Sequence, residues 1–104
     1  MPISTSTMQP LILSHYTMVN ALGRGLAPTV SALRAKKSGL RQCDFMDVAL
    51  DTYIGRVDGL EEESLISGLE DFDCRNNRLA QLGLVSDGFD TAVAAACNRY
   101  GAHR

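Results

Sequence analysis

The residues best suited to nucleophilic chemistry are three cysteines, Cys43, Cys74 and Cys97, and two histidines, His15 and His103. A cysteine becomes a strong nucleophile when a nearby histidine, a positive charge or a helix N-terminus favours its thiolate. No cysteine stands beside a histidine in this sequence, so a Cys–His pair would have to be assembled by the fold. The odd number and wide spacing of the cysteines argue against a disulfide framework and against a zinc site, whose ligands come in close pairs.

Cys74 is the best candidate for a reactive thiol among the three. It follows Asp73, which we expect to cap a helix, and a helix N-terminus favours a thiolate. The alternative, a small half-buried residue without reactivity, is the more common situation for a single cysteine. Cys97 lies in an alanine-rich helical pattern, where we expect a packed and inert thiol. We therefore assign no catalytic, cofactor-binding or metal-binding residue to this chain.

A basic cluster of Arg34, Lys36, Lys37 and Arg41 surrounds the turn at residues 38–39. Such a cluster can bind a phosphate, but positive residues also collect at the C-terminal end of a helix because the helix dipole favours them there. We interpret the cluster as the solvated end of a helix.

Two further polar motifs invite functional interpretations. Gly23-Arg24-Gly25 lacks the continuation of a phosphate-binding or dinucleotide-binding loop, so we expect a loop whose glycines allow unusual backbone angles or a close approach. The acidic run Glu61–Glu63 is interpreted as a solvated loop or helix start.

The composition fits a single small domain without a nucleic-acid footprint. The chain has 104 residues, is 45% hydrophobic and only 6% aromatic, and carries a formal net charge of −2. Binding to nucleic acid would require a basic excess on one face. The polar start, Met1–Gln9, lacks the pattern of a signal peptide, and no apolar run is long enough to span a bilayer. We expect a flexible leader over residues 1–10 and a cytoplasmic protein.

The hydrophobic pattern predicts alternating strands and helices. We expect a buried strand at Leu11–Leu13, a helix from the first turn at Pro28 to Lys37, and a short strand within Asp51–Val57. A second helical region begins at Asp73 and is interrupted at residues 86–88. It resumes at Phe89 and ends at Gly101, so we expect two consecutive helices or one kinked helix. This order predicts an α/β fold, or α+β for these residues in isolation.

Several segments, in this order and spacing, resemble the N-terminal region of the β-ketoacyl-acyl-carrier-protein synthase family. They are Thr17–Gly25, Lys37–Leu40, Leu50–Asp58, Phe72–Ala80 and Arg99–Arg104. Of these, Leu50–Asp58 and Phe72–Ala80 are similar to a bacterial subgroup often found in gene sets for polyene-type pigments, and Arg99–Arg104 resembles the residues that lead into the next core strand. The similarity spans residues 11–104, which we interpret as a partial N-terminal synthase domain. The resemblance also implies that the polar run Arg75–Arg78 begins a helix near the core and the subunit interface, so we assign this run a structural role.

The resemblance implies a thiolase-like layered α-β-α-β-α fold, usually a homodimer. It also implies decarboxylative Claisen condensation of an acyl thioester with malonyl-carrier protein, using a cysteine, two histidines and a lysine. None of these four residues can be carried over, because the family cysteine lies in an Asp-Thr-Ala-Cys-like turn further downstream. Here Asp90-Thr91-Ala92 is followed by Val93. The implied partners are an acyl carrier protein and a second synthase-like subunit.

The leading hypothesis is therefore a synthase fragment from fatty-acid or aryl-polyene-type biosynthesis that is inactive alone. The alternative is a non-enzymatic helical interaction module that binds a partner such as a full-length synthase subunit. It is based on two amphipathic segments, Pro28–Lys37 and Asp73–Tyr100. An independent small enzyme ranks lowest, because the sequence offers no acid–base pair, metal cluster or nucleophile–base motif.

Overall fold

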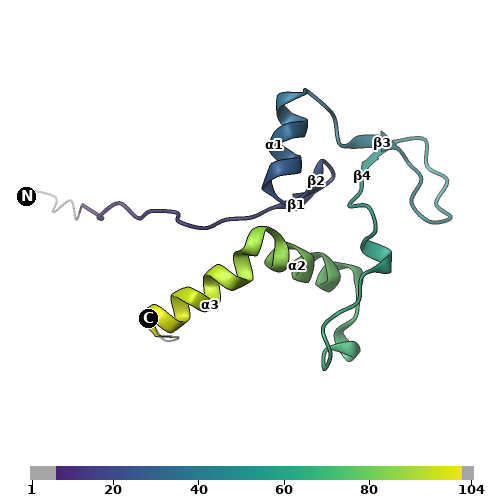
Figure 1. Cartoon of the computed structure of the whole chain (residues 1–104). Coiled ribbons are helices and arrows are strands. Elements are labelled where there is room, and N and C mark those ends of the chain that lie inside the picture. The colour runs from purple at the N-terminus through teal and green to yellow at the C-terminus, as the bar shows by residue number, and fades with distance from the viewer. Residues whose placement is uncertain (1–6, 102–104) are drawn as a thin grey trace, which may run out of the picture.

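The computed structural model describes residues 7–101 and shows a mixed α+β chain (Figure 1). Two small antiparallel hairpins are followed by two consecutive helices. The elements are β1 (Val19–Asn20), β2 (Gly23–Arg24), α1 (Leu26–Arg34), β3 (Leu40–Gln42), β4 (Tyr53–Gly55), α2 (Arg75–Val85) and α3 (Phe89–Tyr100). Single 3₁₀ turns lie at Leu60–Glu62, Glu70–Phe72 and Ser86–Gly88.

The first hairpin pairs β1 with β2 through a tight two-residue turn. Asn20 Oδ1 stabilises the turn by accepting a hydrogen bond from the Leu22 amide at 2.8 Å. The predicted loop at Gly23–Gly25 is wrong in part, because its first two residues form β2. Gly23 is required by packing rather than by a loop: a Cβ there would lie 2.5 Å from the Cβ of Pro28 in α1.

Helix α1 forms where the sequence predicts it but is shorter. It begins at Leu26, so Pro28 lies in the first turn, where a missing N–H has no cost. The buried Thr29 hydroxyl donates to the Gly25 carbonyl at 2.8 Å. The helix ends at Arg34 rather than Lys37, because Lys36 takes a left-handed backbone conformation with φ 54°.

The second hairpin contains one predicted strand and one that the sequence did not predict. β4 lies inside the expected strand region of residues 51–57, and it pairs with β3 in the register Leu40↔Gly55 and Gln42↔Tyr53. β3 was missed because three residues give too short a pattern for period-two alternation to be visible. Both hairpins stand as separate two-stranded sheets.

The predicted strand at Leu11–Leu13 is wrong for this structure. No strand is assigned to these residues, and the three side chains are 91%, 90% and 76% exposed. The segment runs extended away from β1 (Figure 1). A strand needs a neighbour to bond its backbone groups, and among the described residues no strand pairs with this segment.

Helices α2 and α3 form the predicted consecutive pair. The interruption lies at residues 86–88, where Asp87 and Gly88 have φ 57° and 68°. The prediction that Asp73 caps α2 is wrong: Cys74 is the N-cap residue and accepts the first helical hydrogen bond from the Arg78 amide. Among the described residues, no helix is long and apolar enough to cross a membrane.

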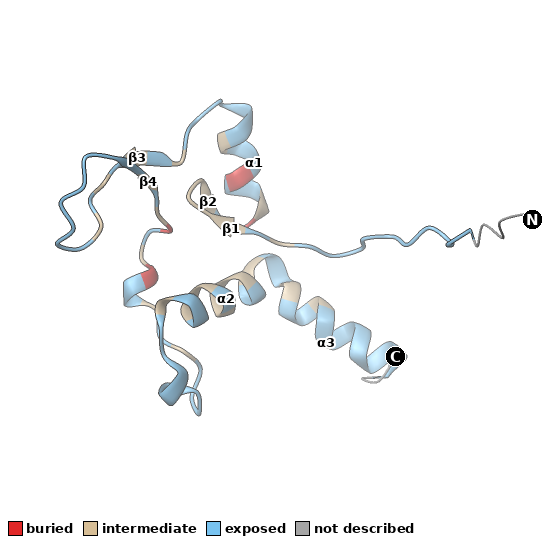
Figure 2. Cartoon of the chain, turned by 180° about the vertical axis from the view of Figure 1, so that it is seen from behind, coloured by how far each residue is buried: buried red, intermediate tan, exposed pale blue. Residues whose placement is uncertain are grey.

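The described part of the chain lacks a consolidated hydrophobic core. Among the described residues only Val57 and Leu60 are buried hydrophobic side chains, and buried positions are scattered through the ribbon (Figure 2). The radius of gyration is 19.1 Å, whereas a compact domain of this length has about 13 Å. The accessible surface is 8781 Å², whereas a compact monomer of this mass exposes about 5,700 Å². The surface that a core would remove from water therefore stays exposed.

Candidate functional site

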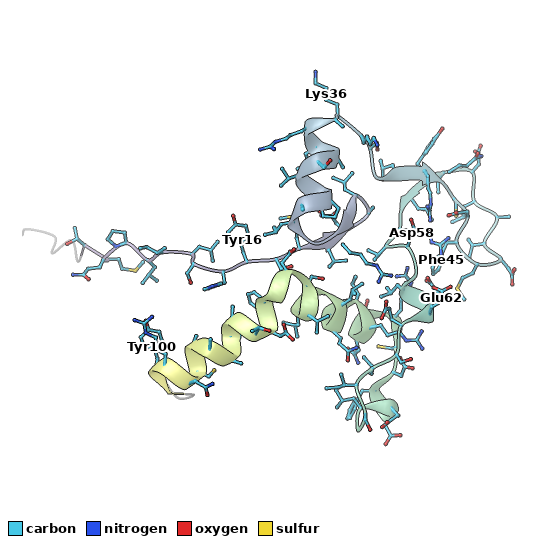
Figure 3. The ribbon with its side chains drawn as sticks, viewed as in Figure 1. Tyr16, Lys36, Phe45, Asp58, Glu62 and Tyr100 are labelled. Atoms are coloured by element: carbon cyan, nitrogen blue, oxygen red, sulfur yellow. The ribbon has the colours of Figure 1, made fainter. Side chains whose placement is uncertain are left out.

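Ion pairs between arginines and carboxylates form the most highly connected part of the structure. We call this set the ionic network. Its arginines are Arg24, Arg41, Arg56, Arg75 and Arg78. Its carboxylates are Asp44, Asp58, Glu61, Glu63 and Asp73. It connects β2, the second hairpin and the start of α2, and Figure 3 shows Asp58, Phe45 and Glu62 on this side of the molecule.

Asp58 anchors the second hairpin to the network. Arg41 Nη2 donates to Asp58 Oδ1 at 2.6 Å, and Arg24 donates to the Asp58 carbonyl. The hydrogen bond from Arg41 is the main cause that lowers the pKa of the Asp58 carboxyl below its usual range. The same bond raises the pKa of Arg41. Both groups therefore stay charged at neutral pH.

Glu61 is the centre of a second cluster. Its Oε1 accepts from Arg75 Nε at 3.0 Å, and its Oε2 lies 3.6 Å from Arg56 Nη2. The backbone amide of Glu61 itself and then the two arginines lower the pKa of this carboxyl. Both guanidinium groups also lie over the Phe45 ring, at 5.0 and 5.5 Å from its centroid. Glu61 is exposed and lies in the 3₁₀ turn Leu60–Glu62, which agrees with the prediction of a solvated loop or helix start, and its ion pairs add a contact that the sequence did not predict.

The start of α2 holds the preceding loop through polar side chains. Arg78 donates to both carboxylate oxygens of Asp73, which lowers the pKa of Asp73. Asn77 donates to the Phe72 carbonyl at 2.7 Å. Gln81 accepts from the Ile66 amide at 2.8 Å. These contacts give the run Arg75–Arg78 a structural part, and they explain why Asp73 cannot serve as the helix cap.

The ionic network neutralises itself. It contains as many arginines as carboxylates, and every arginine has an acidic partner within 3.6 Å. An anion would have to displace a carboxylate that is already bonded to its arginine. The network is therefore suited to holding segments together rather than to binding an anion.

In the described part of the chain, no cysteine thiol is hydrogen-bonded to a histidine. Cys43 is half-buried beside Phe45, Arg56 and Arg75 in a hollow of about 320 Å³, and its thiol donates to the Val48 carbonyl at 3.7 Å. Cys74 is exposed at the N-terminus of α2. Cys97 is also exposed, so the expectation of a packed thiol is wrong, because nothing in the described residues covers that face of α3.

His15 lies near α3 rather than near a thiol. Its Nδ1 is 3.1 Å from the Ser14 hydroxyl, and it shares a hollow of about 330 Å³ with Ala92, Ala96 and Tyr100. His103 lies outside the described residues. Within residues 7–101, no group of three or more His, Cys, Asp or Glu residues is arranged to hold a metal ion.

The predicted basic cluster divides into two parts. Arg34, Lys36 and Lys37 are exposed at the C-terminal end of α1, before the second hairpin, and Lys36 projects into solvent there (Figure 3). Arg41 instead belongs to the ionic network through Asp58 and Asp44.

An apolar groove lies between α2 and the loop before it. We call it the α2 groove, and its volume is about 330 Å³. Its apolar lining includes Ile66, Leu69, Phe72 and Leu84, all of them exposed. Sequence analysis missed this feature because three of these residues lie in a loop without helical or strand periodicity.

Asp87 is a second feature that sequence analysis missed. It accepts hydrogen bonds from the Thr17 hydroxyl at 2.9 Å and from the Leu26 amide at 2.8 Å. The sequence places Asp87 only in a break between two helices. The available signal was that α1 has no capping side chain of its own.

No family model, curated protein or solved structure matches this chain. The geometry alone therefore defines the class: a mixed α+β scaffold that pairs five arginines with five carboxylates and exposes many of its large apolar side chains. Among the described residues it contains no thiol–imidazole pair.

Proposed function

We propose that this chain is the N-terminal structural part of a β-ketoacyl-acyl-carrier-protein synthase and has no condensing activity alone. The proposal rests first on the ordered motifs between residues 11 and 104. On this proposal the two hairpins and three helices belong to a thiolase-like layered fold. The catalytic cysteine, both histidines and the lysine lie in other segments of the enzyme.

The exposure of Leu11, Ile12 and Leu13 is the structural observation that carries the proposal. Three consecutive apolar residues point to both faces of an extended segment, so a strand made from them is buried on both sides. Such strands are typical of sheets that helices cover on both faces, as in layered α/β folds. Here all three side chains are at least 76% exposed, so completion of this layer requires further strands and helices.

The role proposed for the chain is to position other residues rather than to react. Five of its arginines and five of its carboxylates are paired in the ionic network, and its exposed apolar surface is available for packing. An acyl carrier protein and a second synthase-like subunit are the partners that this proposal implies. It also implies a cytoplasmic location.

Reconstitution tests this proposal directly. A synthase of the family is made without the region that corresponds to residues 11–104 and is co-expressed with this chain. Condensation of acyl- and malonyl-carrier protein is then measured. We expect no product from either piece alone and measurable product from the pair. No product from a soluble, co-purified pair, or turnover by this chain alone, would contradict the proposal.

The DNA that follows the Arg104 codon gives a second, cheaper test. We expect an open frame that encodes an Asp-Thr-Ala-Cys-like turn and two later histidines. A downstream region that encodes neither in any frame would remove the support for a condensing enzyme.

A second function, a helical interaction module, is favoured by the α2 groove. The groove is held open by the polar contacts of Asn77 and Gln81, so it exists before a partner arrives. On this alternative, an apolar helix of a synthase subunit fills it. Leu84→Glu should then abolish binding to that subunit, whereas Leu33→Glu, on exposed α1, should not. Equal binding by both variants would contradict the alternative.

A further inference from the structure

Helix α1 has no means of capping its own N-terminus. Its N-cap residue is Gly25, which offers no side-chain acceptor, and its first turn contains no acidic residue. The first amides of a helix lack partners within the helix, and a carboxylate nearby is the strongest substitute. The first amides of α1 therefore need a hydrogen-bond acceptor from another part of the chain.

Asp87 meets this requirement from 61 residues away. Its Oδ2 accepts the Leu26 amide at 2.8 Å, and the same oxygen accepts the Thr17 hydroxyl at 2.9 Å. Three segments thus meet at one carboxylate: the end of the N-terminal segment, the start of α1 and the junction of α2 with α3. In Figure 1 this junction lies next to the start of α1.

The backbone at Asp87 is arranged for this contact. Its φ of 57° and ψ of 21° are left-handed, a conformation that Asp adopts more readily than most non-glycine residues. A carboxylate just before a helix usually serves that helix, yet Asp87 serves α1 and not α3, whose N-cap is Gly88. On the other side, a Cβ on Gly25 would lie 2.8 Å from Asp87 Oδ1, so the glycine also makes room for the contact.

We propose that Asp87 is a conformational clasp: it caps α1 across the chain and so couples the start of α1 to the position of the α2–α3 pair. The clasp replaces a packed core between these parts, because buried hydrophobic residues are confined to Val57 and Leu60 in the described chain. When α2–α3 moves away, α1 loses its cap, and its first turn frays. This inference does not depend on the proposed function.

Amide hydrogen exchange of the whole chain, resolved by NMR, tests the clasp. Asp87→Gly keeps the left-handed backbone without strain and removes only the carboxylate. We expect exchange at Leu26 to become about tenfold faster, because a charge-assisted cap is lost. Asp87→Asn keeps a neutral acceptor, so we expect about a threefold increase. The matched control is Asp90→Ala, which removes a nearby carboxylate bonded only to the Thr91 amide, and it should leave Leu26 unchanged.

A distance measurement gives the second readout. Spin labels are placed at Ser31→Cys in α1 and at native Cys97 in α3, with Cys43 and Cys74 replaced by serine. The distance distribution should broaden in Asp87→Gly and stay narrow in Asp90→Ala. Equal Leu26 exchange in the parent and Asp87→Gly, an unprotected Leu26 in the parent, or equal effects of both substitutions would overturn the proposal. If Asp87→Gly loses its helical circular dichroism, Asp87→Asn decides: acceleration confined to the first turn of α1 supports the clasp, and uniform acceleration overturns it.

Discussion

The ionic network and the apolar surface of the chain differ in whether their side chains find partners within the chain. All five arginines of the network have a carboxylate partner within the chain. The N-terminal segment and the α2 groove, in contrast, present apolar side chains such as Ile12 and Phe72 to water, at 90% and 63% exposure. The ionic network pairs its own charges, whereas the apolar side chains of the N-terminal segment and the α2 groove stay exposed in the described chain.

This difference follows from what each interaction needs. An ion pair is complete with two side chains and tolerates solvent, so it can form on an open scaffold. An apolar face is buried only when another layer of secondary structure packs against it. The two small hairpins and three helices supply only one layer. The ionic network is thus expected to fix local geometry while adding little stability.

The largest effect is expected where the two regions meet, at Leu60. It is the one large side chain that is fully buried in the described residues, and its turn contacts α2. We expect Leu60→Ala to cost about 2–4 kcal/mol, which would unfold a chain with so small a core. Urea titration followed by circular dichroism measures the change. Leu33→Ala, at a 61% exposed position, is the control and should change stability by less than about 0.5 kcal/mol.

Two glycine substitutions should change the free energy of unfolding in opposite directions. Gly25→Ala forces a side chain to adopt φ 97° and to meet Asp87, so we expect a loss of more than about 1 kcal/mol. Gly83 lies inside α2 with nothing within 4 Å of its added Cβ, so Gly83→Ala should stabilise by about 0.5–1 kcal/mol. Thermal melts of both variants measure this, and a shift in the same direction for both would contradict the structure.

Acid should weaken the ionic network before it affects the helices. The pKa values of Asp58, Glu61 and Asp73 are lowered by their arginine or amide partners. A lowered pKa means that the contribution to stability is fully present above the ordinary carboxyl pKa of about 4 and is lost as the pH falls below it. Carboxyl chemical shifts followed by NMR should show these three groups titrating below the ordinary carboxyl pKa of about 4. Titration of all three at that ordinary value would contradict the network.

The smallest effect on stability is expected from the exposed N-terminal segment. Ile12 is 90% exposed, so Ile12→Lys should change the free energy of unfolding by less than about 0.5 kcal/mol. The same substitution should reduce self-association or binding to a partner, measured by sedimentation velocity, because it places a charge in the apolar run. If Ile12→Lys lowered the free energy of unfolding and left association unchanged, the N-terminal segment would contribute to stability rather than to association, which contradicts the account.

Local patterns predicted the helices better than the strands. Pro28 and the apolar spacing predicted α1, and the break at residues 86–88 predicted the junction of α2 and α3. The predicted strand at Leu11–Leu13 did not form because a strand depends on a neighbour that residues 7–101 do not supply. Helix hydrogen bonds are local, whereas strand pairing depends on distant residues.

The polar contacts were not predictable from spacing. Asp87 and Leu26 are 61 residues apart, and Arg24 and Glu63 are 39 apart, so no motif joins them. The site prediction assigned no catalytic residue, and it remains a prediction. Cys97 was misjudged because an alanine-rich helical face implies burial only when another element covers it.

Differential scanning calorimetry of the chain alone tests the central claim most directly. The claim is that this surface is one layer of a larger fold, whose hydrophobic burial is supplied from outside the described chain. A self-sufficient domain of about 100 residues unfolds cooperatively with an enthalpy of about 60–80 kcal/mol. We expect a broad transition with less than about half that enthalpy. A sharp two-state transition with the full enthalpy, from a monomer, would contradict the account.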